Sequence, residues 1–199
     1  MIECEYQQNA ELFIVEGKSA ANAVSVVRRR TDQAILPLQG KMINSRKCTV
    51  KKLCKDPIVQ VMTQSIRSDG LSKFEEGTLR FEKLIILTDG DVDGVHARSL
   101  IMLFFYLHMP WILESKKLYS VYPPLYQIHS VEMSDTLYAF SRMHRESLLK
   151  NLSLEGIGCI ESVHYKGVAS LHSDVLASQC INPKTRAIRQ ISMADCARI

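Results

Sequence analysis

The sequence predicts an α/β fold, in which a parallel sheet is flanked by helices and followed by a small α+β tail. Two apolar runs, residues 12–16 and 84–88, have the length and composition of buried strands. Each run is followed by a segment whose apolar residues recur at helical spacing, which favours βα units and a parallel sheet. A chain of 199 residues that is 46% hydrophobic and 23% charged can also bury a core.

Hydrophobic periodicity and turn residues place the other elements. Before residue 84 we expect, in chain order, a strand at 12–16, a helix at 19–30, a strand at 34–38, a turn at 39–41, helical structure at 49–66 around Pro57, and an exposed loop at 68–77. From residue 84 we expect a strand at 84–88, a helix at 92–114 that Pro110 weakens, a strand at 118–121, helices at 141–150 and 172–180, and a strand at 160–165. The patterning weakens after Pro124, so we predict a first domain at 9–128 and a tail region at 129–199.

Three aspartates follow the second apolar strand at two-residue spacing. Asp89, Asp91 and Asp93 begin on one face because strand side chains alternate, and Gly90 and Gly94 allow a tight turn. Ligands that offer only oxygen favour magnesium or calcium over zinc. The pattern therefore indicates a site for a hard cation, and the alternative interpretation is a solvated acidic turn.

The same pattern opens like a calcium-binding EF-hand loop. Such a loop needs a bidentate glutamate eleven residues after its first aspartate, and Leu100 stands at that position after Asp89. The segment before Asp89 is strand-like rather than helical. Both observations disfavour calcium sensing.

A second apolar strand also ends in a carboxylate and a glycine, at Glu16 and Gly17. Ligands and metals collect at the carboxyl ends of parallel strands, so Glu16 can meet Asp89 and Asp91 there. A strand that ends in Glu-Gly is weak evidence by itself, and Glu16 alone reads as a surface residue. The pairing of two acidic strand ends makes a shared metal site the better interpretation.

Positive charge is concentrated in one part of the chain. The whole chain has a net charge of only +4, whereas residues 17–55 hold ten basic residues against Asp32 alone, a net of +9. Beside a carboxylate site for a metal, this excess suggests a polyanionic partner such as a phosphodiester backbone, and the alternative is a solvated helix face.

Six scattered cysteines without a C-x-x-C pair indicate neither a zinc ribbon nor a disulfide framework. No signal peptide or membrane-spanning stretch is evident, so we expect a cytoplasmic protein.

Four blocks resemble, in their order and spacing, the TOPRIM region in the B subunits of bacterial type IIA DNA topoisomerases. This group includes gyrase B and topoisomerase IV B. The blocks are Glu11–Gly17, Ala34–Lys41, Thr88–Gly94 and Pro123–Tyr126. Two segments of the tail, Tyr165–Gly167 and Asn182–Arg186, are similar to the same family. The resemblance runs from about residue 9 to about residue 192, and nothing resembles the ATP-binding domain of that family.

The resemblance implies a Rossmann-like TOPRIM sheet that binds Mg²⁺ and takes part in cleaving and rejoining double-stranded DNA. It implies Glu16, Asp89 and Asp91 as metal ligands, Glu16 also as the catalytic acid/base, and Lys41 and Asn44 as residues that contact DNA. The nucleophilic tyrosine would come from a topoisomerase A subunit, and ATP would bind a separate domain or chain. The implied location is the cytoplasm, in association with the nucleoid.

Departures from the family pattern keep other functions open. The family usually has Asp-Ser-Ala-Gly-Gly after Glu-Gly, whereas this chain has Lys-Ser-Ala-Ala-Asn at 18–22. The tail also loses an acidic residue and a glycine within 168–171. One alternative is a catalytically impaired TOPRIM remnant that binds DNA or a topoisomerase. Another is a primase or nuclease of the same superfamily, which the absence of paired cysteines and the block at 123–126 disfavour.

Overall fold

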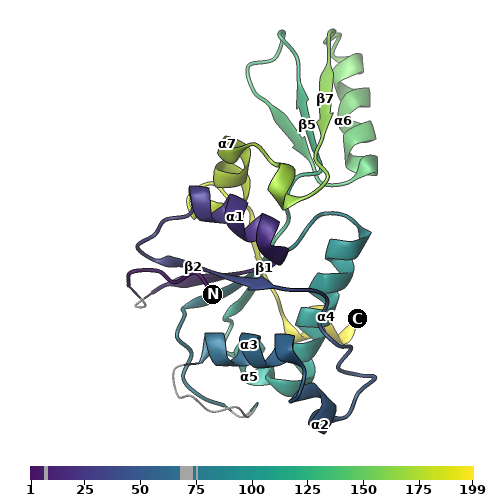
Figure 1. The fold of residues 1–199 in the computed structure, drawn as a ribbon. Helices are drawn as coiled ribbons and strands as arrows, with labels where there is room; N and C mark the ends of the chain where they lie inside the picture. The colour runs from purple at the N-terminus through teal and green to yellow at the C-terminus, as the bar shows by residue number, and fades with distance from the viewer. Residues whose placement is uncertain (7–8, 68–73, 75) are drawn as a thin grey trace.

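The structure is a computed structural model that describes residues 1–6, 9–67, 74 and 76–199 (Figure 1). Its main sheet has five strands in the order β2-β1-β3-β4-β8, of which the first four are parallel and the last is antiparallel. The strands are β1 (Glu11–Glu16), β2 (Gln33–Leu38), β3 (Lys83–Leu87), β4 (Leu118–Val121) and β8 (Ile188–Gln190). The predicted α/β class with a mostly parallel sheet is confirmed.

Helices cover both faces of this sheet (Figure 1). On one face lie α1 (Gly17–Val27), the 3₁₀ turn η1 (Val168–Ser170), α7 (Ser173–Leu176) and the π-helical segment η2 (Ala177–Ile181). On the other face lie α3 (Pro57–Ile66), α4 (Val92–His108), α5 (Pro110–Glu114) and α8 (Met193–Ala197), with the short α2 (Val50–Leu53) beside them.

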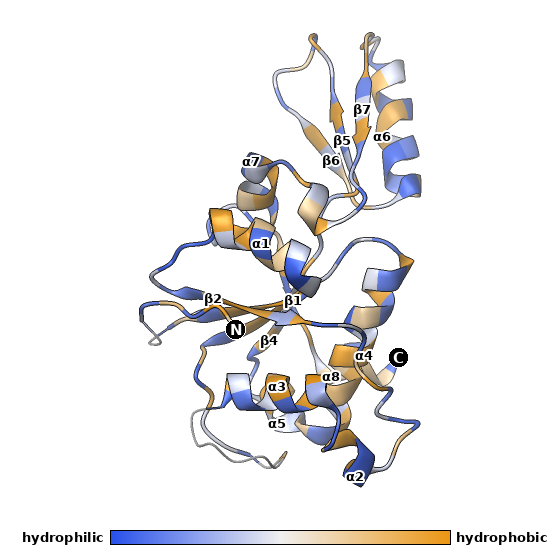
Figure 2. Ribbon diagram, in the orientation of Figure 1, coloured by the Kyte–Doolittle hydropathy of each residue, from blue (hydrophilic) through white to orange (hydrophobic). Residues whose placement is uncertain are grey.

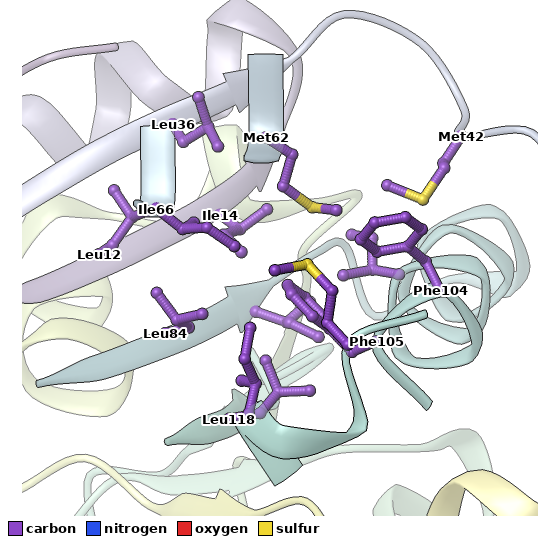
Figure 3. Close-up of a cluster of buried hydrophobic side chains, with 14 of the residues drawn as sticks. Leu12, Ile14, Leu36, Met42, Met62, Ile66, Leu84, Phe104, Phe105 and Leu118 are labelled. Atoms are coloured by element: carbon purple, nitrogen blue, oxygen red, sulfur yellow. The ribbon is translucent and has the colours of Figure 1, made fainter. Parts of the chain in front are cut away.

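Strand side chains alternate between two apolar cores, as a sheet that is buried on both faces requires. Leu12, Ile14 and Leu84 point to one core, where they meet Met62 of α3 and Phe104 of α4 (Figure 3). The intervening strand residues point to the second core under α1 and η1. Figure 2 shows hydrophobic residues concentrated in the sheet and in the part of α4 that lies beneath it.

A smaller antiparallel sheet projects from the main body (Figure 1). It has the order β6-β5-β7, made of β5 (Tyr126–His129), β6 (Leu137–Ala139) and β7 (Glu161–His164), and is accompanied by α6 (Arg142–Leu154). Its own small core contains Ile128, Ala139 and Leu152. We call residues 126–164 the outlying unit.

After β7 the chain returns to the main body and completes it. Tyr165 and Val168 are buried in the core under α1, and β8 adds the fifth strand to the main sheet. Arg186 forms a buried ion pair of 2.5 Å with Glu11 at the start of β1. The division into 9–128 and 129–199 remains a proposal, and the packing shows the last part of the chain integrated with the first.

Most elements that the sequence predicts are present, with shifted ends. The predicted helix at 92–114 is interrupted at Met109, because Pro110 lacks the N–H that would continue α4 and instead begins α5. β5, β6, β8 and α8 were not predicted, since these short segments show no clear periodic pattern. Most of the predicted loop at 68–77 lies outside the described residues.

Two general expectations can be compared with the structure. All six cysteines are free thiols, in agreement with the absence of a disulfide framework from the sequence. Within the described residues, no helix has the length and apolar character needed to cross a membrane.

Candidate functional site

The acidic strand ends predicted from the sequence lie side by side. β1 and β3 are parallel neighbours, with Val15 opposite Leu87, so Glu16 and Asp89 emerge at the same edge of the sheet. The chain runs from β1 outward to β2 and later returns to β3 on the other side of β1. The carboxyl ends of β1 and β3 are therefore the topological switch point of the sheet. Ligands of open α/β sheets bind at such a point.

The turn after β3 is folded tightly against the start of α4. Asp91 caps the helix through its Oδ1 atom, which accepts a hydrogen bond from the Gly94 amide at 2.8 Å. A Cβ atom on Gly94 would lie 2.1 Å from the backbone oxygen of Asp89, so only glycine fits there. The positive end of the α4 dipole therefore faces the acidic turn.

The carboxylates experience each other's charge. Burial raises the pKa of Glu16, and Asp89, Asp91 and Asp93 raise it further, while Lys41 opposes the change. Burial also raises the pKa of Asp89; an amide hydrogen bond from Val168 counteracts this, and the charge of Asp91 adds to it. This mutual repulsion would be relieved by a bound cation.

The donor set fits a hard divalent cation such as Mg²⁺. Glu16 Oε2 and Thr88 Oγ1 are buried and have no hydrogen-bond partner among the residues that the structure describes, and both residues line a cavity of about 10 Å³. Carboxylate and hydroxyl oxygens are the ligands that Mg²⁺ prefers. Within the described residues, however, no three His, Cys, Asp or Glu side chains are already grouped closely enough to hold a metal ion.

Lys41 lies at this site, whereas Asn44 lies further along the same loop. The exposed Lys41 ammonium pairs with Asp93 at 2.6 Å, which ties the loop after β2 to the acidic turn. The half-buried Asn44 accepts a hydrogen bond from the Arg46 amide through its side-chain oxygen. This bond uses only the oxygen, so the amide NH₂ group can still donate to a phosphate.

The basic segment at 17–55 is divided by the fold. Residues 28–30 lie in the α1–β2 connection at the opposite end of the sheet, where Arg29 pairs with Asp32 at 2.5 Å. The exposed basic residues at 46–55 come later in the chain, after the carboxyl end of β2. Residues 28–30 are therefore too distant to position a polyanion at the acidic site, whereas Lys18 and Lys41 stand at its edge of the sheet.

Two features of the site lie outside the set of predicted site residues. The Val168 amide donates to Asp89 Oδ1 at 2.7 Å, and a backbone donor leaves no side-chain signal in the sequence. Arg98 of α4 is buried against the ring of Tyr122, with its guanidinium carbon 4.3 Å from the ring centroid. In the described part of the chain, its Nη1 atom has no hydrogen-bond partner. Burial lowers the pKa of Arg98.

Removing the charge of Asp89 is expected to stabilise the chain when no metal is bound. In the variant Asp89→Asn the side chain can still accept the Val168 amide, while the repulsion with Glu16 and Asp91 is reduced. We expect its melting temperature at pH 7 in a chelator to rise by on the order of 2 °C. Asp135→Asn, an exposed acid in the outlying unit, is the control and should change little. A lower melting temperature for Asp89→Asn would contradict the electrostatic description.

Comparison with known proteins agrees with this geometry. A family model of the Toprim domain matches residues 11–121, which run from β1 to β4 and include every predicted site residue. The chain belongs to the Toprim domain family. The Toprim match confirms the predicted family and its Rossmann-like sheet, and the assignment of individual site residues stays a prediction.

Relatives of this Toprim chain include the B subunits of two topoisomerases. The chain is 36% identical over 185 residues to the B subunit of DNA topoisomerase 4 from Rickettsia felis, covering 93% of this chain and 28% of that protein. It is 37% identical over 184 residues to the protein of the same name from Bartonella bacilliformis, covering 92% and 26%. It is 35% identical over 191 residues to the B subunit of DNA gyrase from Archaeoglobus fulgidus, covering 96% and 29%. The chain thus spans less than a third of the length of these relatives.

Proposed function

We propose that this Toprim chain forms the magnesium-dependent DNA cleavage and religation centre of a type IIA DNA topoisomerase. The observation that carries the proposal is the placement of Glu16 and the Asp89–Asp93 turn on adjacent strand ends at the switch point. The relatives named as B subunits of topoisomerase 4 and gyrase support it, because their similarity extends over more than nine-tenths of this chain.

The residues have distinct roles in this proposal. Glu16, Asp89 and Asp91 would hold Mg²⁺, which when bound supplies positive charge for the phosphoryl oxygens and the leaving 3′ oxygen. Glu16 would also exchange a proton with that 3′ oxygen. Lys41 and Asn44 would contact the phosphodiester backbone, which positions duplex DNA without reading its sequence.

The proposed reaction needs groups that other chains or domains supply. A topoisomerase A subunit would provide the tyrosine that attacks DNA, and a separate ATPase domain or chain would drive the complete cycle. The partners are therefore double-stranded DNA and these two proteins, in the cytoplasm and with the nucleoid.

Reconstitution tests the proposal directly. The chain is mixed with a bacterial topoisomerase IV A subunit and a radiolabelled DNA duplex, in Mg²⁺ or in EDTA, and protein-linked DNA is trapped with detergent and counted. We expect linked DNA only when the chain and Mg²⁺ are both present. Equal amounts of linked DNA in EDTA, or with the A subunit alone, would contradict the proposal.

The second candidate is a Toprim remnant that binds DNA or a topoisomerase without cleaving. The observation in its favour is the exposed Lys18 at the start of α1, at the same sheet edge, where the family usually has an acid. Magnesium affinity measured by calorimetry separates the two functions. A cleavage centre should lose Mg²⁺ binding when Asp89 and Asp91 are both replaced by asparagine, whereas a remnant should show little change.

A further inference from the structure

The acidic turn is held from the side by a segment that is distant in the sequence. The Val168 amide, 79 positions away, donates a hydrogen bond of 2.7 Å to Asp89 Oδ1. A Cβ atom on Gly167 would lie 2.6 Å from Asp89 Oδ2, so the backbone of Gly167 touches the same carboxylate. The Ser170 hydroxyl holds the backbone of Gly167 in place: it accepts a hydrogen bond from the Gly167 amide at 3.1 Å and donates one to the Gly167 carbonyl at 2.7 Å.

A second contact reaches the same turn from a different segment. A Cβ atom on Gly90 would lie 2.7 Å from Leu125 Cδ2, so the Leu125 side chain rests directly on the Gly90 backbone. Leu125 immediately precedes β5, and the Gly167 segment comes shortly after β7. Both contacts are therefore made by the two segments that connect the outlying unit to the main body. We call these segments, at Leu125 and at residues 165–168, the two stems.

The two stems are bonded to each other. The Tyr165 amide donates to the Leu125 carbonyl at 2.8 Å, which continues the antiparallel pairing of β5 with β7 down to the main body. Tyr165 and Val168 are both buried, at 3% and 0% exposure, in the core under α1. Leu125 and Gly167–Val168 therefore form one rigid clamp on the residues 89–90.

We propose that the clamp positions the carboxylate of Asp89 as a metal ligand, with the Val168 amide as its directing donor. The proposal rests on the proposed function for the identity of the cation. A hydrogen bond to Oδ1 fixes the rotation of the carboxylate and turns its remaining electron pairs in one direction, as groups behind metal ligands commonly do. The outlying unit thus has a direct mechanical connection to the metal site through its two stems.

Proline at position 168 removes the amide donor together with the buried valine side chain. Val168 is the first residue of a 3₁₀ turn, a position where proline is well tolerated, and the extended Gly167 (φ 172°, ψ 178°) suits a residue before proline. Val168→Ala is the matched control, because it keeps the amide and also loses the buried valine side chain. Melting curves of both variants verify that they fold.

The experiment measures Mn²⁺ binding to the whole chain by electron paramagnetic resonance. We expect Val168→Pro to bind Mn²⁺ about tenfold more weakly than Val168→Ala, in the range seen when groups behind metal ligands are removed. If the two variants bind Mn²⁺ equally well, and the unsubstituted chain also binds it, the positioning role of the clamp is overturned and the proposed metal site is not. No Mn²⁺ binding by the unsubstituted chain would instead overturn the proposed metal site, and the positioning role with it.

Amide hydrogen exchange tests the contact itself without any metal. The Val168 amide should exchange slowly in the unsubstituted chain and clearly faster in Asp89→Ala, where its acceptor is missing. The Leu171 amide, which donates to the Val168 carbonyl, reports whether the 3₁₀ turn remains intact. If the Val168 amide exchanges equally fast in both proteins, the clamp is overturned irrespective of metal binding.

Discussion

Replacing Glu16 by alanine should slow DNA cleavage by the reconstituted complex by about 10²–10⁴-fold. The variant removes a proposed metal ligand and the proposed acid/base at the leaving oxygen together. Because burial and neighbouring negative charges raise the pKa of Glu16, we expect its removal to relieve repulsion in the metal-free chain, and a melting curve verifies that the variant folds. The measurement is the initial rate at which protein-linked DNA forms at saturating Mg²⁺.

A glutamate at the other end of the sheet provides the control for this variant. Glu82 precedes β3 and pairs with Lys117 at 2.5 Å, away from the carboxyl edge. Glu82→Ala should cleave DNA at nearly the unsubstituted rate. Cleavage that survives Glu16→Ala within about threefold would remove Glu16 from the catalytic assignment, whatever the family resemblance.

Arg186→Met should give the largest loss of stability, about 3–5 kcal/mol in the free energy of unfolding. The guanidinium donates to both oxygens of Glu11, at 2.8 and 2.5 Å, and both side chains are at most 5% exposed. Without its partner, Glu11 keeps a buried charge, which Gln33 and the more distant Lys83, at 3.6 Å, offset in part. Urea unfolding at pH 7 measures the change.

The pH dependence identifies the cause of this loss. Burial alone would raise the pKa of Glu11, but hydrogen bonds from Arg186 and Gln33 outweigh it and hold the pKa below its ordinary value of 4.5. A lowered pKa adds stability that is complete above the unfolded-state pKa and is lost as the pH falls through the folded-state pKa. The difference between the two proteins should therefore be greatest near pH 7 and shrink below about pH 4.5.

Two further variants separate a buried charge from lost packing. The double variant Glu11→Gln with Arg186→Met removes both charges and should recover much of the lost stability. Arg142→Met breaks the exposed pair between Arg142 and Glu146 and should cost only about 0.3–0.5 kcal/mol. If the double variant is as unstable as Arg186→Met alone, the ion pair is not the cause.

The local sequence pattern was sufficient to locate an element where that element is long and its buried residues recur at a regular spacing. The apolar strands that end at Glu16 and before Asp89 could be located from composition alone, and their carboxylates were placed at one sheet edge by the general behaviour of parallel strands. The two separate helices α4 and α5 were suggested only by Pro110. The three-residue β8 gave no periodic signal, because it becomes a strand only through its pairing with β4.

The fold class and the family could be predicted from side-chain type and short-range spacing, and the same local pattern is the basis of the chemistry proposed for the site. The distant groups that surround the site could not be predicted in this way and became visible in the folded chain. The Val168 amide on Asp89 and the Lys41–Asp93 pair join residues between 52 and 79 positions apart. The Arg186–Glu11 pair spans 175 positions. The physical reason is that such contacts arise from packing of the whole chain, and a backbone amide has the same composition at nearly every residue.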